Sequence, residues 1–105
     1  MIALTQGHIP YYAVIFTSIR TDVDNGYKQT SDRMMQLAAK QPGFLGVESA
    51  HDDMGITISY WKDEESIRLW KANAEHMSAQ EHGRMEWYSA YRTRVCKVER
   101  EYGIE

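Results

Sequence analysis

The chain has 105 residues, of which 43% are hydrophobic and 26% charged, a composition typical of one folded domain with a hydrophobic core. The formal net charge is -3 and the Lys and Arg residues are spread along the chain, which argues against nucleic acid as a partner. Cys96 is the single cysteine, no apolar run approaches the roughly 18 residues of a membrane span, and the N-terminus does not resemble a secretion signal, so we expect a cytoplasmic protein without membrane contact.

The first half of the chain predicts an arm, a strand and a helix. Residues 1–10 are expected to form an N-terminal arm and residues 11–105 a single domain. YYAVIFTSI, residues 11–19, is rich in β-branched and aromatic side chains and predicts a strand whose two faces are both mostly apolar. After the turn-forming TDVDNG, residues 27–41 carry apolar side chains at helical spacing, and Pro42 and Gly43 end this predicted helix at Gln41.

The second half predicts a hairpin, a helical region and a closing strand. FLGVESA and ITISYW, joined by HDDMG, are typical of a β-hairpin with Asp52, Asp53 and Gly55 near its tip. A second helix is expected to begin near Asp63 or Glu64, because acidic side chains favour the first turn of a helix. We expect Asn73 to cap a new helical segment, and SAYRTRVCKVERE, residues 89–101, to form the last strand.

The predicted order is strand, helix, strand, strand, helix, strand. This order indicates the α+β class and a ferredoxin-like split βαβ fold, in which a four-stranded antiparallel sheet carries its helices on one face. Two helices cover only one face of the sheet, so the second apolar face of the first strand favours a homodimer in which two sheets pack together. Any small-molecule cavity would then lie between each sheet and its own helices.

Three stretches carry a resemblance to a known family: QPGFLGVES, ITISYWKDEESIRLW and RVCKVER. In order and spacing they are similar to the antibiotic biosynthesis monooxygenase (ABM) superfamily of dimeric α+β barrels, over nearly all of Tyr11 to Arg100. The resemblance implies the barrel fold. It leaves the reaction open, since members include cofactor-independent oxygenases of aromatic polyketides, quinol oxygenases and haem-degrading monooxygenases.

The haem-degrading branch of the resemblance implies an Asn on the first strand, a Trp on the second helix and an axial His on the following helical segment. Trp70 matches the Trp by its position after Trp61, but the first strand contains no Asn. The expected axial position falls near Gln80, with His76 and His82 on either side of it. We therefore expect no cofactor, and keep haem as the alternative.

Cofactor-independent oxygenation of a phenol or quinol needs a dry aromatic pocket, a proton acceptor and donors that stabilise the substrate anion. On one helix Trp70, Asn73 and Met77 share a face, and a break at Asn73 would turn His76 towards the same pocket. We therefore expect His76 as the base and Asn73 as the donor. Candidate substrate-binding residues are Trp70, Met77, Phe16 and Arg84.

Each candidate also has a structural interpretation. Trp70 has the spacing of a core residue, His76 lies beside Glu75 in a polar segment typical of solvated side chains, and Asn73 is equally suited to a helix cap. Arg84 belongs to an Arg- and aromatic-rich stretch that suits the rim of a dimer interface better than a pocket mouth. The four histidines share no ligand spacing, so no metal site is expected. The leading prediction is monooxygenation of a small aromatic or quinol-like molecule; haem binding and non-catalytic ligand binding are the alternatives.

Overall fold

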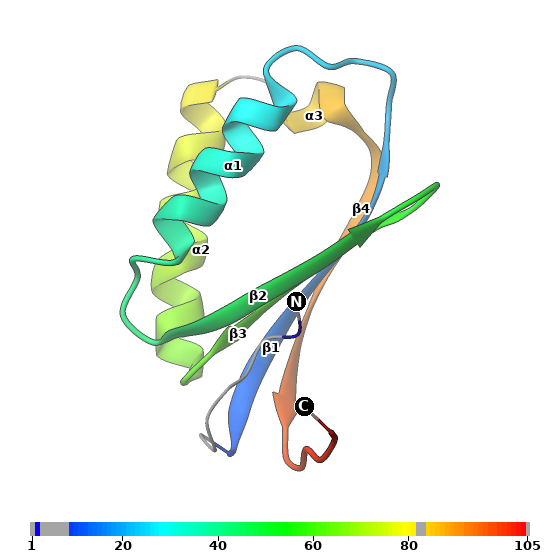
Figure 1. Ribbon diagram of the computed structural model, residues 1–105. Coiled ribbons are helices and arrows are strands. Elements are labelled where there is room, and N and C mark those ends of the chain that lie inside the picture. The colour runs from blue at the N-terminus through cyan, green and yellow to red at the C-terminus, as the bar shows by residue number, and fades with distance from the viewer. Residues whose placement is uncertain (1, 3–8, 82–83, 105) are drawn as a thin grey trace.

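The computed structural model describes the backbone of residues 2, 9–81 and 84–104, and the side chains of these residues except 75–81, 84 and 85. In this part of the chain the elements are β1 (Tyr11–Arg20), α1 (Tyr27–Ala38), β2 (Phe44–His51), β3 (Gly55–Trp61), α2 (Glu64–Glu81), α3 (Arg84–Trp87) and β4 (Tyr88–Val98). The four strands form an antiparallel sheet in the order β2-β3-β1-β4. Both long helices lie on the same side of it (Figure 1), which confirms the predicted ferredoxin-like α+β fold. No described helix is long and apolar enough to cross a bilayer.

The face of the sheet that carries the helices is here called the inner face. Tyr12 and Val14 of β1 pack there against a core of Ala38, Trp61 and Ile67, and the alternation of a strand extends the same face to Phe16 and Ser18. Trp61 is fully buried; its ring packs edge-on against Phe44 and stacks on Trp70, with ring centroids 6.1 Å apart in the second pair. The core therefore occupies one end of the inner face, at the start of β1.

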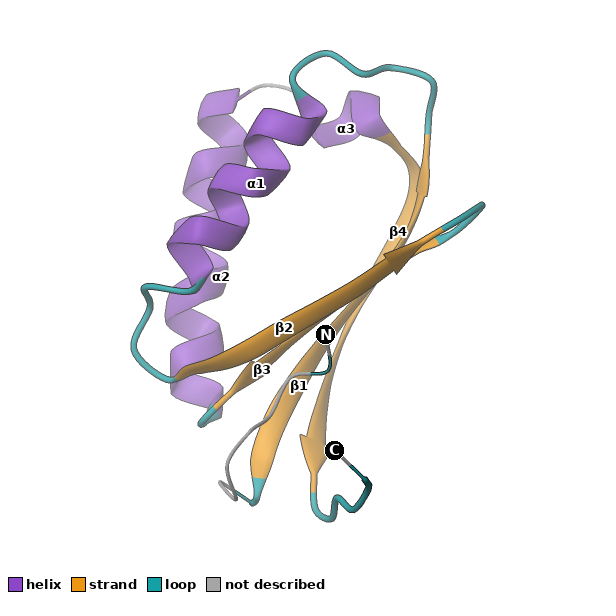
Figure 2. Ribbon diagram, viewed as in Figure 1, coloured by secondary structure: helices purple, strands orange, loops and turns teal. Residues whose placement is uncertain are grey.

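On the opposite side of the sheet, the outer face, β1 is also mostly apolar. Ala13, Ile15 and Ile19 of β1 alternate onto it, and Ile15 pairs with Ile58 of β3. Neither long helix covers this side of the sheet (Figure 2), and Ile19 is 47% exposed. The prediction that β1 is apolar on both faces is therefore confirmed.

The first helix is shorter than its sequence pattern predicts. It ends at Ala38, three residues before Gln41, because the amides of Lys40 and Gln41 donate to carbonyls three residues back, those of Leu37 and Ala38. Such bonds tighten the chain into a last turn that is no longer α-helical. The helix begins after Gly26, whose φ of 78° suits glycine, rather than at an Asp or Asn cap of the preceding turn.

The prediction of a new helical segment at Asn73 is wrong, because α2 continues without a break from Glu64 to Glu81. The side chain of Asn73 is exposed, so its amide can form hydrogen bonds with water and need not cap a helix. Its neighbours Ala72 and Ala74 are strong helix formers. The sequence pattern also missed the short helix α3. The last strand begins at Tyr88, one residue earlier than expected, and ends at Val98 rather than residue 101.

The start of α2 is capped by Asp63. Its Oδ1 accepts hydrogen bonds from the backbone amide and the hydroxyl of Ser66, at 2.8 and 2.7 Å. These hydrogen bonds favour the carboxylate and lower the pKa of Asp63 below its ordinary 3.8. The cap therefore contributes to stability at pH values above 3.8, and the contribution is lost as the pH falls through the lowered pKa of the folded state.

Asp63→Ala is expected to lower the thermal midpoint near neutral pH, because it leaves amides of the first turn of α2 without their cap. As the pH falls from 3.8 through the lowered pKa of Asp63, the midpoints of variant and parent should converge, since acid protonates the cap of the parent. Circular dichroism melts across this range measure both effects, with Asp53→Ala at the exposed hairpin tip as the control. A gap between variant and parent that stays constant into strong acid would contradict the role assigned to the carboxylate.

Candidate functional site

Five aromatic rings gather at the end of the inner face away from the core: Phe16, Tyr27, Trp87, Tyr88 and Tyr91, here called the aromatic cluster. Phe16 lies 5.4 Å from Tyr88 and 5.5 Å from Tyr91 between ring centroids. Tyr27, the first residue of α1, packs edge-on against Trp87 at 5.6 Å and Tyr88 at 5.9 Å. The cluster thus joins β1, α1, α3 and β4 and gives this end of the sheet an aromatic surface.

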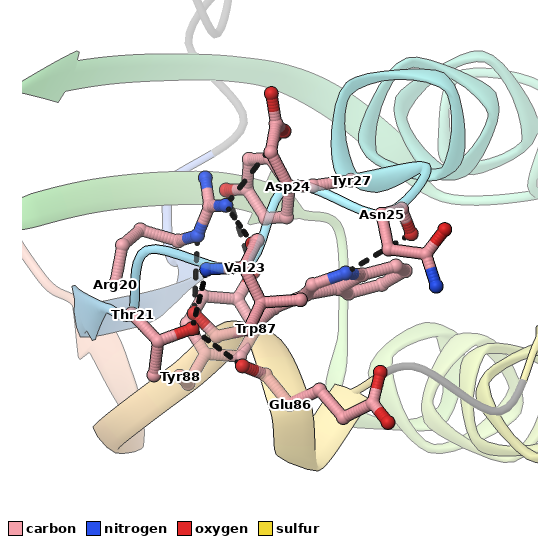
Figure 3. Close-up of polar contacts among 9 residues, drawn as sticks. All are labelled: Arg20, Thr21, Val23, Asp24, Asn25, Tyr27, Glu86, Trp87 and Tyr88. Carbon is pink, nitrogen blue, oxygen red and sulfur yellow. Dashed lines mark hydrogen bonds and ion pairs between the residues drawn. The ribbon is translucent and has the colours of Figure 1, made fainter.

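Hydrogen bonds to backbone carbonyls, from one amide and three side chains, join the end of β1 and the β1–α1 loop to α3 next to this cluster (Figure 3). The carbonyl of Trp87 accepts from the amide of Thr21 at 2.9 Å and from Nε of Arg20 at 3.1 Å. The indole N–H of Trp87 donates in turn to the carbonyl of Asn25 at 3.2 Å, and the hydroxyl of Thr21 donates to the carbonyl of Glu86. Two segments more than sixty residues apart are thereby held together at the point where α1 begins.

The side chain of Arg20 takes part in this connection between the loop and α3. Its guanidinium carbon lies 3.4 Å from the centroid of the Tyr27 ring, a cation–π contact, and its Nη2 donates to the carbonyl of Val23 at 3.0 Å. The same nitrogen lies 3.9 Å from the exposed carboxylate of Asp24. Figure 3 shows the guanidinium beside the loop, next to Asp24 and Tyr27. Arg20 therefore acts mainly as a positioning residue for the loop and for Tyr27.

A cavity of about 450 Å³ opens beside the aromatic cluster, where the end of β1, the tip of the β2–β3 hairpin and the start of α1 meet. This volume is within the usual range for small-molecule sites. Tyr27 belongs to both the cavity and the cluster, so the cavity adjoins an aromatic surface. The lining residues are Ser18, Arg20, Thr21, Asp22, Tyr27, His51, Asp52, Asp53 and Gly55.

Two polar side chains meet at the cavity wall. Ser18 is 6% exposed, yet no described residue forms a hydrogen bond with its hydroxyl. Because no described side-chain nitrogen or oxygen is both enclosed and unpartnered, Ser18 Oγ must remain open to the cavity. Across the sheet Ser18 and His51 both pair with Gly55, and a methyl group added at Gly55 would lie 3.3 Å from Ser18 Oγ and from His51 Nδ1. The missing side chain of Gly55 therefore leaves a space between two polar groups.

The structure places the described candidate residues in different parts of the molecule. Trp70 is half-buried and stacks on Trp61 in the core, whereas Phe16 lies in the aromatic cluster. Tyr12, which faces the core, and Phe16 are four residues apart on β1, roughly 13 Å at the rise of a strand. Asn73 is exposed on α2. The candidate side chains of His76, Met77 and Arg84 lie outside the described residues.

Sequence reasoning missed Ser18 and His51. A signal for Ser18 was present, because it lies two residues after Phe16 in the predicted strand and two is the period of one face. His51 stood next to the predicted hairpin turn, where side chains are usually solvated. Only the pairing of both residues with Gly55 brings them together, and pairing partners on separate strands are not visible in a local pattern.

The sequence model of the family described as "Antibiotic biosynthesis monooxygenase" (ABM) matches residues 10–82. The chain belongs to the ABM family. A relative of this ABM protein is "Uncharacterized protein YqjZ" of Bacillus subtilis (strain 168), 52% identical over 94 residues that span 88% of this chain and 82% of the relative. At this level of identity the two proteins share the family, and the name of the relative assigns no reaction.

Solved structures with the same fold include two kinds of ABM-like protein. SnoaB from Streptomyces nogalater, a cofactor-independent oxygenase, matches in a variant form with a TM-score of 0.71 and 13% identity over 87% of this chain and 95% of its own. A variant of MhuD with two manganese protoporphyrin IX bound per active site matches with a TM-score of 0.60 and 14% identity, over 88% of this chain and 98% of its own. These identities relate the ABM protein to both by fold alone.

Proposed function

We propose that this ABM-family protein is a cofactor-independent monooxygenase that acts on a small aromatic, quinol-like substrate. The observation that supports the proposal most directly is the aromatic cluster of the inner face, which adjoins a cavity of about 450 Å³. Tyr27 lines the cavity and belongs to the cluster, so a planar ring bound there can make stacked or edge-on contacts with an aromatic side chain. Phe16, expected from the sequence to bind substrate, belongs to this surface.

The reaction that we propose needs no external reductant. A quinol gives up a hydroxyl proton, and its anion transfers electrons to O₂. One oxygen atom then bonds to a ring carbon and the other leaves as water, so the quinol and O₂ become a hydroxyquinone and H₂O. The four electrons that reduce O₂ all come from the ring. The protein contributes a bound orientation, a proton acceptor and polar groups near the phenolate oxygen.

The test is oxygen uptake by the purified full-length chain with a panel of substituted quinols. We expect one O₂ consumed for each quinol and a hydroxyquinone as the product. Phe16→Leu is expected to lower kcat/KM about tenfold or more, because it removes the ring that contacts both Tyr88 and Tyr91. Phe44→Leu is the matched control, since the second of the two phenylalanines packs against Trp61 at the other end of the inner face.

Two results would overturn this function. Oxygen uptake no faster than that of the quinols in buffer would show that the protein is not an oxygenase of these quinols. Equal losses of kcat/KM in Phe16→Leu and Phe44→Leu would show that the aromatic cluster is not the substrate site. Haem titration belongs to the same experiment. A Soret band in the parent that disappears in His76→Ala would replace the proposal with haem binding, the alternative that the sequence left open.

We further propose that the protein is a homodimer joined through the outer face of the sheet. Ile15, Ile19 and Ile58 give that face an apolar surface that the helices do not cover. Burial of such a surface against its own copy removes apolar area from water on both protomers, and the two-fold arrangement is the commonest among homo-oligomers.

The single cysteine reports on this interface. Cys96 of β4 pairs with Ala13, lies on the outer face and is exposed in one protomer. We expect a scattering mass near twice 12.2 kDa and slow reaction of Cys96 with a thiol reagent. Ile58→Lys should give the monomer mass and fast reaction, because it buries a charge in the interface. Leu69→Lys on α2, 49% exposed in the parent, should change neither quantity. A 12.2 kDa particle with reactive Cys96 at micromolar concentration would contradict the dimer.

A further inference from the structure

Ser18, His51 and Gly55 form a polar cradle at the end of the inner face. Ser18 is 6% exposed as a residue, and its Oγ, which opens to the cavity, has no hydrogen-bond partner among the described residues. The imidazole of His51 likewise forms no hydrogen bond with a described residue. Both groups lie 3.3 Å from the position that a Cβ of Gly55 would occupy, which is within reach of a single oxygen atom placed near that point. A hydroxyl that opens to a cavity and has no protein partner is free to bond a ligand that enters the cavity.

The rim of the cavity around this cradle is acidic. Asp22 follows β1, and Asp52 and Asp53 form the hairpin tip; all three line the cavity. None of these carboxylates forms an ion pair or side-chain hydrogen bond with a described residue. Among the described residues that line the cavity, Arg20 is the one that is always positively charged. Its guanidinium already contacts the carbonyls of Trp87 and Val23 and the ring of Tyr27. The field at the cavity mouth therefore repels anions.

We propose that the cradle binds the hydroxyl group of a phenol or quinol and that the acidic rim selects neutral or cationic rings over anionic ones. His51 Nδ1 accepts the hydrogen of the ligand hydroxyl, and Ser18 Oγ donates to its oxygen. This inference rests on the proposed function for the identity of the ring. It names the atoms that bind the reacting hydroxyl, Ser18 Oγ and His51 Nδ1. It also assigns the role of proton acceptor to His51 of the β2–β3 hairpin, whereas the sequence had suggested His76 of α2.

Binding is measured without turnover, under anaerobic conditions, with three ligands that share one phenol group. These are 4-ethylphenol, which is neutral, tyramine, which is cationic, and 3-(4-hydroxyphenyl)propionate, which is anionic. Ligand-observed NMR titration of the full-length protein gives a Kd for each. We expect tyramine to bind at least as tightly as 4-ethylphenol, and the propionate to bind about fivefold or more weakly than 4-ethylphenol, because the rim attracts the cation and repels the anion.

Variants separate the cradle from the rim. Ser18→Ala should weaken 4-ethylphenol binding roughly threefold to tenfold by removing one hydrogen bond, and Gly55→Ala should weaken it further by filling the space. The Asp52→Asn, Asp53→Asn double variant should bring the Kd of the propionate close to that of 4-ethylphenol. Asp32→Asn on α1, where Asp32 pairs with Lys28 away from the cavity, is the charge control and should leave all three values unchanged.

The two proposals fail in different ways. Undetectable binding of 4-ethylphenol, or equal Kd values in the parent, Ser18→Ala and Gly55→Ala proteins with native circular dichroism spectra, overturns the cradle. A propionate Kd that matches 4-ethylphenol in the parent overturns the selection by charge. Phenol binding that depends on Ser18 and Gly55, combined with no oxygen uptake from any quinol, supports the cradle and overturns the oxygenase.

Discussion

Gly43→Ala is expected to destabilise the protein by about 3 kcal/mol or more. Gly43 joins α1 to β2 with a φ of 83°, and an L-residue pays for that backbone conformation. A Cβ at this position would also lie 2.0 Å from Ser66 Oγ and 2.7 Å from Ser66 Cβ at the start of α2. The loop and the helix would have to separate, which strains the bond from the Lys62 amide to the Gly43 carbonyl.

Gly26→Ala is the matched control, because Gly26 has nearly the same φ, 78°, but no atom lies within 4 Å of its added Cβ. It should cost about 1 kcal/mol, the backbone term alone. Urea unfolding followed by circular dichroism gives both values. In the Gly43→Ala background, Ser66→Gly should recover part of the loss, because it removes the atoms that clash. Equal losses at the two glycines, or no recovery with Ser66→Gly, would show that close packing at Gly43 is not the cause.

Trp87→Ala is expected to cost about 3 to 5 kcal/mol. Trp87 is 6% exposed, its ring packs on Tyr27, and its indole N–H and carbonyl both bond to the β1–α1 loop. Removal of the side chain leaves a cavity below the aromatic cluster and frees the carbonyl of Asn25 from its donor. Since Tyr27 also lines the ligand cavity, phenol binding should weaken together with stability.

Trp87→Phe separates the hydrogen bond from the volume of the side chain. It keeps an aromatic ring but lacks the indole donor, so we expect a loss of only about 1 kcal/mol. Leu69→Ala on α2, half-exposed in the parent, should cost less than Trp87→Ala by at least about 2 kcal/mol. Circular dichroism in urea measures all three without reliance on tryptophan fluorescence. A Trp87→Ala protein as stable as Leu69→Ala would mean that α3 is not fastened to the loop in solution.

Local patterns were reliable where a single element decides its own conformation. The run of β-branched and aromatic residues at 11–19 lies in β1, and the apolar spacing after Gly26 lies in α1. HDDMG contains the hairpin turn, although its first residue, His51, ends β2 and its last, Gly55, begins β3. The acidic residues near Asp63 marked the start of α2 because the dipole of a helix and its free amides act within one turn. Asn73 misled the prediction, since its cap preference is weaker than the helix propensity of the alanines on either side.

The candidate site was less accessible to such reasoning. The face shared by Trp70, Asn73 and Met77 suggested a pocket on α2, but the ring of Trp70 belongs to the core with Trp61. A large aromatic side chain at helical spacing looks the same in the sequence whether it packs in a core or lines a cavity. Phe16 was predicted to bind substrate, and it lies beside Tyr88 and Tyr91, which belong to the stretch that the sequence assigned to a rim.

By itself the amino-acid sequence determined the order of strands and helices, the two apolar faces of β1 and membership of the ABM family, because each depends on residue types and spacings within short segments. Tertiary structure alone decided that Ser18 and His51 face each other across Gly55 and that Trp87 holds the loop before Tyr27. Those contacts join residues far apart in the chain, and strand register and packing, which set them, are properties of the whole fold.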